Sequence, residues 1–238
     1  LRPGGTIVEP TSGNTGVGLA IAAALRGYRC IFVMPDKMSQ EKISMLRAYG
    51  AEVVVCPYAV APESPESYYS VSDRLAEEIP GAYKPDQYTN EFNPRAHYET
   101  TGPELLHDLP TITHFVAGLG TTGTLMGTGR FRRDKVEGIQ IVAAEPRYGE
   151  LVYGLRNIDE GYVPELYDAT VLSRRFSVGT RDAVLRTRQL VEVEGIFAGF
   201  SSGAILHAAL AVAHEAVKAG QRADVAFVIC DGGWKYLS

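Results

Sequence analysis

The sequence predicts an α/β fold built on mainly parallel sheets. Short runs rich in Val and Ile, each of strand length, alternate with amphipathic segments of helix length along most of the 238 residues. Parallel neighbours in a sheet need a crossover connection, which a helix supplies, so the alternation indicates sheets covered by helices on both faces. The length allows one large domain or two smaller ones.

The first part of the chain alternates strand and helix. We expect strands at residues 6–9, 30–34 and 52–56, and helices at residues 16–26, 40–49 and 68–78. Residues 82–88 are expected to form a short strand or an extended segment. The Pro- and Asn-rich residues 90–94 interrupt the pattern, so we predict a domain boundary that separates residues 1–92 from residues 93–238.

The second part of the chain restarts the alternation. It predicts strands at residues 114–117, 140–145 and 225–229, and helices at residues 96–108, 125–133, 181–194 and 204–219. Residues 147–170 lack periodicity and are rich in Tyr, Gly, Asp and Glu. A stretch of this length without regular structure is often functional, so we expect it to contribute to a site.

Composition excludes several classes of partner. The formal net charge of −5 is spread without long acidic or basic runs, which argues against nucleic acid or an anionic membrane surface. Cys30, Cys56 and Cys230 lie far apart with no C-x-x-C pair, so we expect three buried cysteines, no disulfide framework and no metal site. We find no apolar stretch of about 18 residues and no leader before residue 1, and therefore expect a cytoplasmic protein.

The first candidate site is the loop at residues 10–16, PTSGNTG, which comes between a predicted strand and a predicted helix. Backbone N–H groups and the positive end of the helix dipole create an anion site at such a junction. The alternative is an ordinary helix cap supplied by Ser12 or Asn14. A cap needs one such residue, whereas four polar donors flank two glycines here, so we favour a ligand-binding loop.

Two further glycine-bearing loops precede predicted helices. The second loop, residues 118–124, reads GLGTTGT and suits a phosphate, although alone it does not distinguish a nucleotide from another phosphate ligand. The third loop, residues 199–204, reads GFSSGA, and its alternative is a serine helix cap. We expect all three loops at the carboxyl ends of strands, where open α/β sheets collect their ligands.

Five motifs, in their order and spacing, resemble the β-family of pyridoxal-phosphate enzymes: PTSGNTG, KPDQY, TTGPE, GLGTTGT and SSGA. Within that family the similarity is to cysteine synthases and cystathionine β-synthase, and it covers about the whole chain. The resemblance implies fold type II, in which two three-layer parallel-sheet domains like those of the tryptophan synthase β-subunit enclose the cofactor in a cleft. Residues 1–92 would be the small domain that binds the substrate carboxylate, and residues 93–238 the large cofactor-binding domain.

The resemblance also implies a role for particular residues. Those expected to bind the substrate carboxylate are Thr11, Ser12, Asn14, Thr15 and Gln87. Those expected to hold pyridoxal 5′-phosphate are Asn14, Gly120, Thr121, Thr122, Gly123, Thr124 and Ser201. Ser201 would hydrogen-bond the pyridine nitrogen. Because a neutral hydroxyl does not hold that nitrogen protonated, β-elimination is favoured over transamination or decarboxylation.

The residues around Arg156 favour one substrate. Residues 153–161 read YGLRNIDEG where O-acetylserine-specific relatives carry a GPHKIQGI type of sequence, and residues 113–168 resemble the actinobacterial cysteine synthases that use O-phosphoserine. Arg156 is therefore expected near the β-end of the substrate. A guanidinium suits a phosphate dianion through paired hydrogen bonds, which an acetyl ester would not exploit. The alternative is an ordinary exposed arginine.

The family's Schiff-base lysine lies in an S-x-K-D-R type of motif upstream of the first loop. No lysine present here has that context, so we expect this residue to precede Leu1, both ends to be missing and the chain as given to contain no catalytic residue and to be inactive.

The resemblance implies a homodimeric cysteine synthase, a transferase of cysteine biosynthesis that replaces the β-substituent of O-phosphoserine or O-acetylserine with sulfur. The sulfur donor would be sulfide or a small sulfur-carrier protein. Open alternatives are a cystathionine β-synthase, a serine/threonine dehydratase, a catalytically dead module that binds the C-terminal peptide of a serine acetyltransferase, and a nucleotide-binding Rossmann protein.

Overall fold

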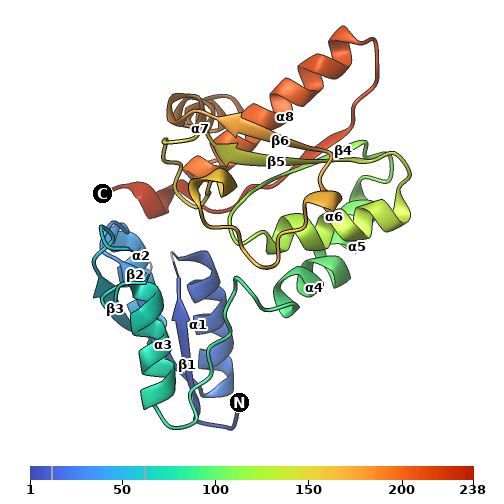
Figure 1. Cartoon of the computed structure of the whole chain (residues 1–238). Coiled ribbons are helices and arrows are strands. Elements are labelled where there is room, and N and C mark those ends of the chain that lie inside the picture. Colours follow the sequence, from blue (N-terminus) through green and yellow to red (C-terminus); the bar gives the residue numbers. More distant parts are fainter. Residues whose placement is uncertain (12, 62) are drawn as a thin grey trace. The chain divides into compact units, whose positions relative to one another are not determined.

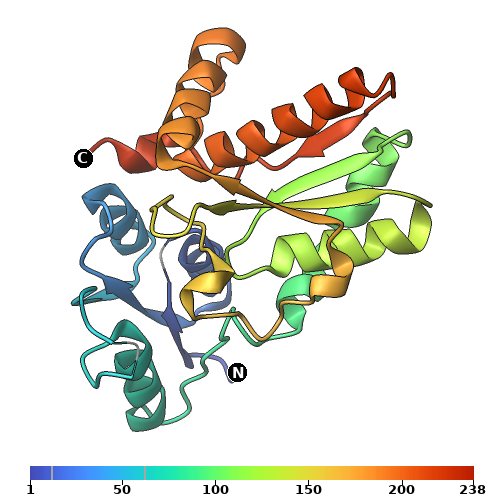
Figure 2. The same ribbon diagram turned by 45° about the horizontal axis from the view of Figure 1, so that its top comes forward.

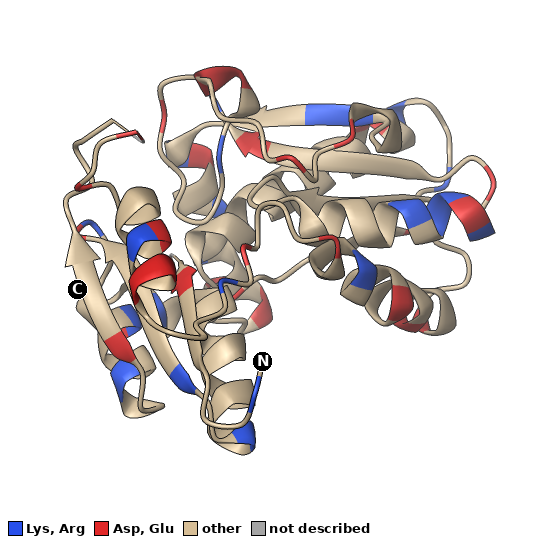
Figure 3. Cartoon of the chain, turned by 60° about the horizontal axis from the view of Figure 1, so that its bottom comes forward, with Lys and Arg blue, Asp and Glu red and all other residues tan. Residues whose placement is uncertain are grey.

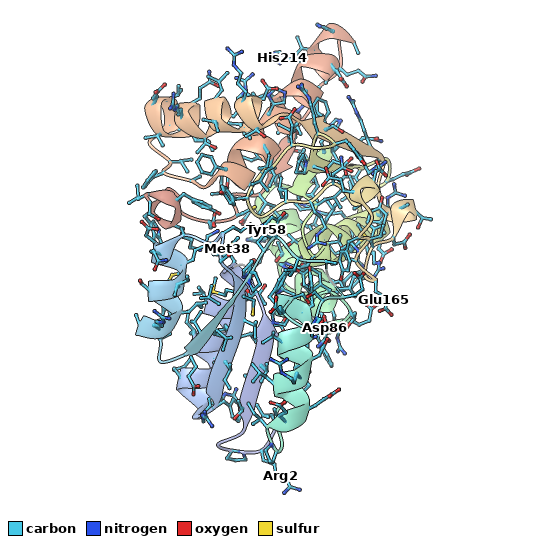
Figure 4. The ribbon with its side chains drawn as sticks, turned by 60° about the vertical axis from the view of Figure 1, so that its left-hand side comes forward. Arg2, Met38, Tyr58, Asp86, Glu165 and His214 are labelled. Carbon is cyan, nitrogen blue, oxygen red and sulfur yellow. The ribbon has the colours of Figure 1, made fainter. Side chains whose placement is uncertain are left out.

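A computed structural model describes residues 1–11, 13–61 and 63–238. The described residues form two compact units (Figure 1). Unit 1 comprises Leu1–Asp86 and the returning residues Lys235–Ser238, and unit 2 comprises Gln87–Trp234. Asp86, where the chain leaves unit 1, is labelled in Figure 4. The domain boundary predicted after Phe92 falls a few residues later than this change of unit.

Unit 1 is built around a parallel sheet with the strand order β1-β2-β3. Its elements are β1 (Thr6–Pro10), α1 (Asn14–Arg26), β2 (Arg29–Pro35), α2 (Gln40–Ala48), β3 (Glu52–Cys56) and α3 (Tyr68–Glu78). Successive side chains of a strand point to opposite faces of the sheet. Phe32 of β2 therefore packs in the same cluster as Leu46 of α2, whereas Val33 packs with Val71 of α3 on the other face.

Unit 2 is built around a parallel sheet with the strand order β6-β5-β4-β7. Its elements are α4 (Phe92–Glu99), α5 (Thr101–Asp108), β4 (His114–Gly118), α6 (Gly123–Lys135), β5 (Gln140–Pro146), β6 (Arg174–Val178), α7 (Thr180–Glu194), α8 (Phe200–Lys218) and β7 (Val225–Phe227). Short 3-10 helices occur at Ile158–Glu160, Ala169–Val171 and Gly233–Tyr236.

The sheet of unit 2 also has helices on both faces, as Figure 2 shows with α6 on one side and α8 on the other. Phe115 of β4 packs with Leu125 of α6, and the next residue, Val116, packs with Ile205 of α8. The predicted α/β class with parallel sheets is thus confirmed in each unit. Basic and acidic residues are interspersed along the ribbon of both units (Figure 3).

The structure corrects the predicted elements in three places. Strand β6 was not predicted because the charged residues Arg174 and Arg175 interrupt the apolar pattern that is typical of a strand. It forms an edge of the sheet, where charged residues are common. The helix predicted at residues 96–108 is two helices, since Pro103 has no N–H and its ring would clash with the Glu99 carbonyl in a continuous helix. Residues 82–88 form only an isolated bridge, between Tyr83 and Ile7.

Two expectations drawn from composition also need correction. Helix α8 has 19 residues and a mean hydropathy of 1.2, which by length and composition would suffice to cross a membrane, contrary to expectation. Half of that window is buried, as in the core helix of a globular unit. Cys30 and Cys56 are buried as predicted, whereas Cys230 is only partly buried.

Candidate active site

The first loop connects β1 to α1 in unit 1 and is shaped by Thr11. This residue is buried, and its Oγ1 accepts hydrogen bonds from the backbone N–H of Gly13 at 3.1 Å and of Gly16 at 3.2 Å. Helix α1 starts at Asn14, so Asn14 is not its cap, and Thr15 is half-buried in the first turn. The predicted site residue Ser12 lies outside the described residues. The oxygen of Thr11 therefore shapes the loop.

Two buried lysines adjoin this loop. Lys235 Nζ donates to Asn14 Oδ1 at 2.6 Å, which turns the amide oxygen of Asn14 toward the ammonium. The stem of Lys42 lies against Gly13, and its Nζ lies 4.2 Å from the centre of the Tyr236 ring. Both lysines add positive charge beside a helix N-terminus, which favours an anionic ligand. The sequence offered no signal for this role of Lys235, because 221 positions separate it from Asn14.

The second loop connects β4 to α6, and Thr122 is its unusual residue. Thr122 has φ 72°, a left-handed conformation that costs energy for a β-branched residue. Its side chain is 2% exposed, and within the described part of the chain its Oγ1 has no hydrogen-bond partner. A strained backbone and a buried hydroxyl that lacks a partner both indicate a position shaped for a ligand.

Asn93 links the second loop to the KPDQY motif, and the sequence analysis missed it. Its Nδ2 donates to the backbone oxygen of Gln87 at 2.8 Å and to Thr121 Oγ1 at 3.2 Å. A Cβ at Gly123 would overlap the amide of Asn93, so only glycine fits there. Asn93 lies within residues 90–94, whose Pro- and Asn-rich composition predicted a domain boundary and gave no indication of a site residue. The structure thus ties the predicted substrate residue Gln87, itself buried, to the predicted phosphate loop.

His97 of α4 supports Thr124 at the start of α6. Its Nε2 lies 3.0 Å from Thr124 Oγ1, and its Nδ1 lies 2.9 Å from Thr101 Oγ1. Burial lowers the pKa of His97, so the imidazole is neutral at pH 7. With the proton on Nε2, the ring donates to Thr124 Oγ1 and leaves the Thr124 hydroxyl hydrogen to donate to a ligand.

The third loop does not follow a strand, contrary to expectation, because it follows α7. Helix α8 starts at Phe200 after Gly199, so Ser201 and Ser202 lie in its first turn and do not cap it. The loop nevertheless adjoins the segment after β7, since Ser202 Oγ accepts from the backbone N–H of Cys230 at 2.9 Å. Strand β7 pairs in parallel with β4, so the second and third loops lie at the same edge of the sheet.

Gly154 brings the two loops of unit 2 together. A Cβ at Gly120 would lie 3.0 Å from the carbonyl oxygen of Gly154, and a Cβ at Gly154 would lie 3.6 Å from Ser201 Oγ. Burial raises the pKa of the nearby Cys230 thiol, an effect that the Ser201 hydroxyl partly offsets. Ser201 itself is buried. The irregular segment after β5 thus lies beside the second and third loops.

Arg156 lies beside the second loop. Its backbone N–H donates to the carbonyl oxygen of Leu119 at 2.8 Å. Its guanidinium carbon lies 5.1 Å from the centre of the Tyr88 ring and 4.6 Å from that of Tyr162, and its Nη2 donates to the Tyr88 hydroxyl at 3.3 Å. Arg156 is therefore a part-buried arginine held against aromatic rings.

The edge of unit 2 fits a phosphate monoester. The second loop supplies the start of α6, where no side chain of the described residues caps the helix, together with the buried hydroxyl of Thr122. Such a helix start binds anions through its backbone N–H groups. Ser201 lies at the same edge and could hydrogen-bond a ring nitrogen. No group of three His, Cys, Asp or Glu side chains suited to a metal is found in the described residues.

The chain is similar to several known proteins. Residues 2–231 match the family model described as pyridoxal-phosphate dependent enzyme. Cystathionine beta-synthase of Oryctolagus cuniculus is 41% identical over 251 residues, which cover all of this chain and 45% of that protein. Cysteine synthase B of Pseudomonas aeruginosa is 39% identical over 239 residues, which cover all of this chain and 77% of that protein. The chain thus spans less than half the length of the first of these relatives.

Proposed function

This chain belongs to the family of pyridoxal-phosphate dependent enzymes, and from that premise we propose that the protein replaces the β-substituent of an activated serine with sulfur, with O-phosphoserine as the favoured substrate. Relatives named cysteine synthase B and cystathionine beta-synthase support a sulfur-containing product. The observation that carries the choice of substrate is the place of Arg156, whose backbone N–H donates to the carbonyl of Leu119 at the start of the second loop.

The cofactor, when bound, supplies an electron sink for the negative charge that develops at Cα of the substrate. In this proposal the residues of the second loop, Gly120 to Thr124, hold its phosphate, and Ser201 hydrogen-bonds its ring nitrogen. A serine hydroxyl cannot hold a proton on that nitrogen as a carboxylate would, so the sink is weaker. Loss of a leaving group from Cβ is then favoured over reactions that need a stronger sink.

The residues of the first loop are proposed to bind the substrate carboxylate. The ammonium of Lys235 donates to Asn14 Oδ1, and the Nδ2 of Asn14 is the atom proposed to donate to an anionic oxygen of the substrate. Thr15 in the first turn of α1 and Gln87 after unit 1 complete the proposed set. The positive charge of Lys42 and Lys235 would strengthen the binding of a carboxylate.

Arg156 is proposed to bind the phosphate group of O-phosphoserine. A guanidinium forms paired, charge-assisted hydrogen bonds with a phosphate dianion. An acetyl ester carries no charge and offers one carbonyl oxygen, so it gains much less from the same residue. The sulfur nucleophile that completes the replacement, sulfide or the thiocarboxylate of a small carrier protein, remains part of the proposal.

Cystathionine beta-synthase activity is the second candidate, and the 41% identity to proteins of that name favours it. The two functions differ in the nucleophile. Full-length protein loaded with pyridoxal phosphate should therefore be supplied in turn with sulfide, with homocysteine and with no nucleophile. Cysteine as the product supports our proposal, cystathionine supports the second candidate, and pyruvate without a nucleophile would indicate a dehydratase.

The choice of substrate is tested with Arg156→Ala. Hydrogen bonds to charged groups contribute about 1.5–3 kcal/mol each, so kcat/KM for O-phosphoserine should fall about 10- to 100-fold relative to that for O-acetylserine. Arg188→Ala is the matched control, because Arg188 is an exposed arginine on α7. Equal losses with both substrates would contradict the proposed preference for phosphoserine.

A further inference from the structure

Two tyrosine rings from distant parts of the chain enclose the guanidinium of Arg156. Tyr88 closes the KPDQY motif, and Tyr162 lies in the irregular segment after β5. The guanidinium carbon lies 5.1 Å from one ring centre and 4.6 Å from the other. The two rings also contact each other, with centres 5.7 Å apart and planes at 88°, so they form one edge-to-face pair.

These contacts orient the guanidinium. The guanidinium carbon lies over both rings, and a cation over the face of an aromatic ring is attracted by the quadrupole of the ring. One donor, Nη2, reaches the Tyr88 hydroxyl at 3.3 Å. The backbone of Arg156 is anchored separately by the hydrogen bond to Leu119. Arg156 is therefore held by its backbone, by two aromatic rings and by one hydrogen bond of its guanidinium.

The segment that carries Tyr88 is itself held from both sides. The backbone oxygen of Gln87 accepts from Asn93, which also bonds Thr121 of the second loop. The backbone oxygen of Tyr88 accepts from the N–H of Leu166 at 3.4 Å. These contacts fix the backbone that carries Tyr88 relative to the second loop, and the Tyr88 side chain in turn contacts Arg156.

We infer that Tyr88 and Tyr162 are positioning residues that hold the guanidinium of Arg156 in one orientation and so determine the preference for a substrate with a phosphate at Cβ. The inference rests on the proposed function, in which Arg156 binds that phosphate. A free arginine side chain has many rotamers, and ordering it on substrate binding costs free energy. The tyrosine pair orders the side chain of Arg156 before the substrate binds. Only a substrate that binds the guanidinium therefore gains affinity from this ordering.

If these tyrosines only filled space, the effect of replacing each one would depend on how deeply its side chain is buried. Tyr88 and Tyr162 differ in burial. Tyr88 is 7% exposed, whereas Tyr162 is 39% exposed. Truncation of Tyr162 should therefore cost little stability but should remove one of the two rings that contact the guanidinium. Tyr162 is for this reason the better position for a test, and Tyr88→Phe is the second variant because it keeps the buried ring and removes only the hydroxyl.

The test measures kcat and KM of the cofactor-loaded full-length enzyme for O-phosphoserine and for O-acetylserine. Tyr162→Leu should lower the ratio of kcat/KM for the two substrates about 5- to 30-fold, and the loss should appear as a higher KM for O-phosphoserine. Tyr162→Phe keeps a ring and should restore the ratio to within about 2-fold of the unmodified enzyme. Tyr88→Phe should lower the ratio about 2- to 10-fold.

Tyr148→Leu is the matched control, because Tyr148 belongs to the same irregular segment and is 74% exposed. Binding of O-phosphoserine, measured by isothermal titration calorimetry, gives a readout that does not depend on turnover and should weaken in Tyr162→Leu by a similar factor. Thermal unfolding of each variant separates a loss of preference from a loss of folded protein.

The outcomes separate this inference from the proposed function. If Arg156→Ala leaves the ratio of the two substrates unchanged, the proposed role of Arg156 fails and the inference fails with it. If Arg156→Ala lowers the ratio but Tyr162→Leu and Tyr88→Phe both behave like Tyr148→Leu, the proposed function stands and the inference is overturned. A lowered ratio in Tyr162→Leu that Tyr162→Phe restores supports the inference.

Discussion

Arg132 on α6 is the residue whose replacement we expect to stabilise the protein. Its side chain is 0% exposed, and none of its three guanidinium nitrogens has a hydrogen-bond partner within the described residues. Burial lowers the pKa of Arg132 for the same reason, because removal from water disfavours the charged form. One turn earlier, the buried Oγ1 of Thr128 also has no hydrogen-bond partner among the described residues.

The size of the effect follows from the cost of burying a charge. Exchange of a buried ionic group for an apolar side chain of similar volume is neutral or stabilises by about 1–4 kcal/mol, even when the original charge is paired. Methionine has nearly the volume of arginine and fills the same space, so little is lost in packing. A gain of about 2–3 kcal/mol would raise the midpoint of thermal unfolding by about 4–12 °C for a chain of this size.

The assay compares Arg132→Met with Arg133→Met, the exposed neighbour on the same helix. Thermal unfolding followed by circular dichroism and urea unfolding at pH 7 should both show Arg132→Met as the more stable variant, with Arg133→Met close to the unmodified protein. A lower midpoint for Arg132→Met than for Arg133→Met would refute the reasoning, since it would mean that the guanidinium is stabilised where it lies.

Two further predictions concern the site and the response to pH. Asn93→Ala should weaken the retention of pyridoxal phosphate about 5- to 30-fold in equilibrium dialysis, because it removes the hydrogen bonds that join Gln87 to Thr121, whereas Asn90→Ala should not; equal retention by both variants would contradict this role. Burial is the first cause that lowers the pKa of three histidines: His97, His114 and His207. The unfolded chain therefore takes up more protons than the folded chain as the pH falls through about 6.5. The free energy of unfolding, measured in urea, should accordingly be largest above about pH 6.5 and should decrease toward pH 5, and a rise over that range would show the assignment to be wrong.

Much of the fold could be predicted because local patterns determine local structure. The bounds of β3 and α3 agree with the prediction at both ends, since each apolar pattern ends at clear breaks in the sequence. The helix that was wrongly predicted as continuous failed on one local rule, the effect of Pro103. Strand β6 could not be recognised in this way, because its place at a sheet edge permits a charged sequence that reads as a loop.

The candidate site likewise has parts that local patterns predicted and parts that they did not. The order of the PTSGNTG, GLGTTGT and SSGA motifs was sufficient to indicate the family and its cofactor, because each motif is a short run whose chemistry is local. The contacts that complete the site join residues far apart in the chain, as Lys235 joins Asn14 and Tyr162 joins Tyr88. The sequence could not predict such pairs, because no periodicity and no fixed spacing relates their two residues.

What the sequence determined by itself was therefore the class of fold, the family and the loops that we propose to bind the ligand. Only the tertiary structure decided which side chains support those loops, that Thr122 is strained and buried, and that Arg156 contacts two aromatic rings. The physical reason is that strand and helix follow from interactions between near neighbours, whereas the partner of a buried polar group depends on how the whole unit packs.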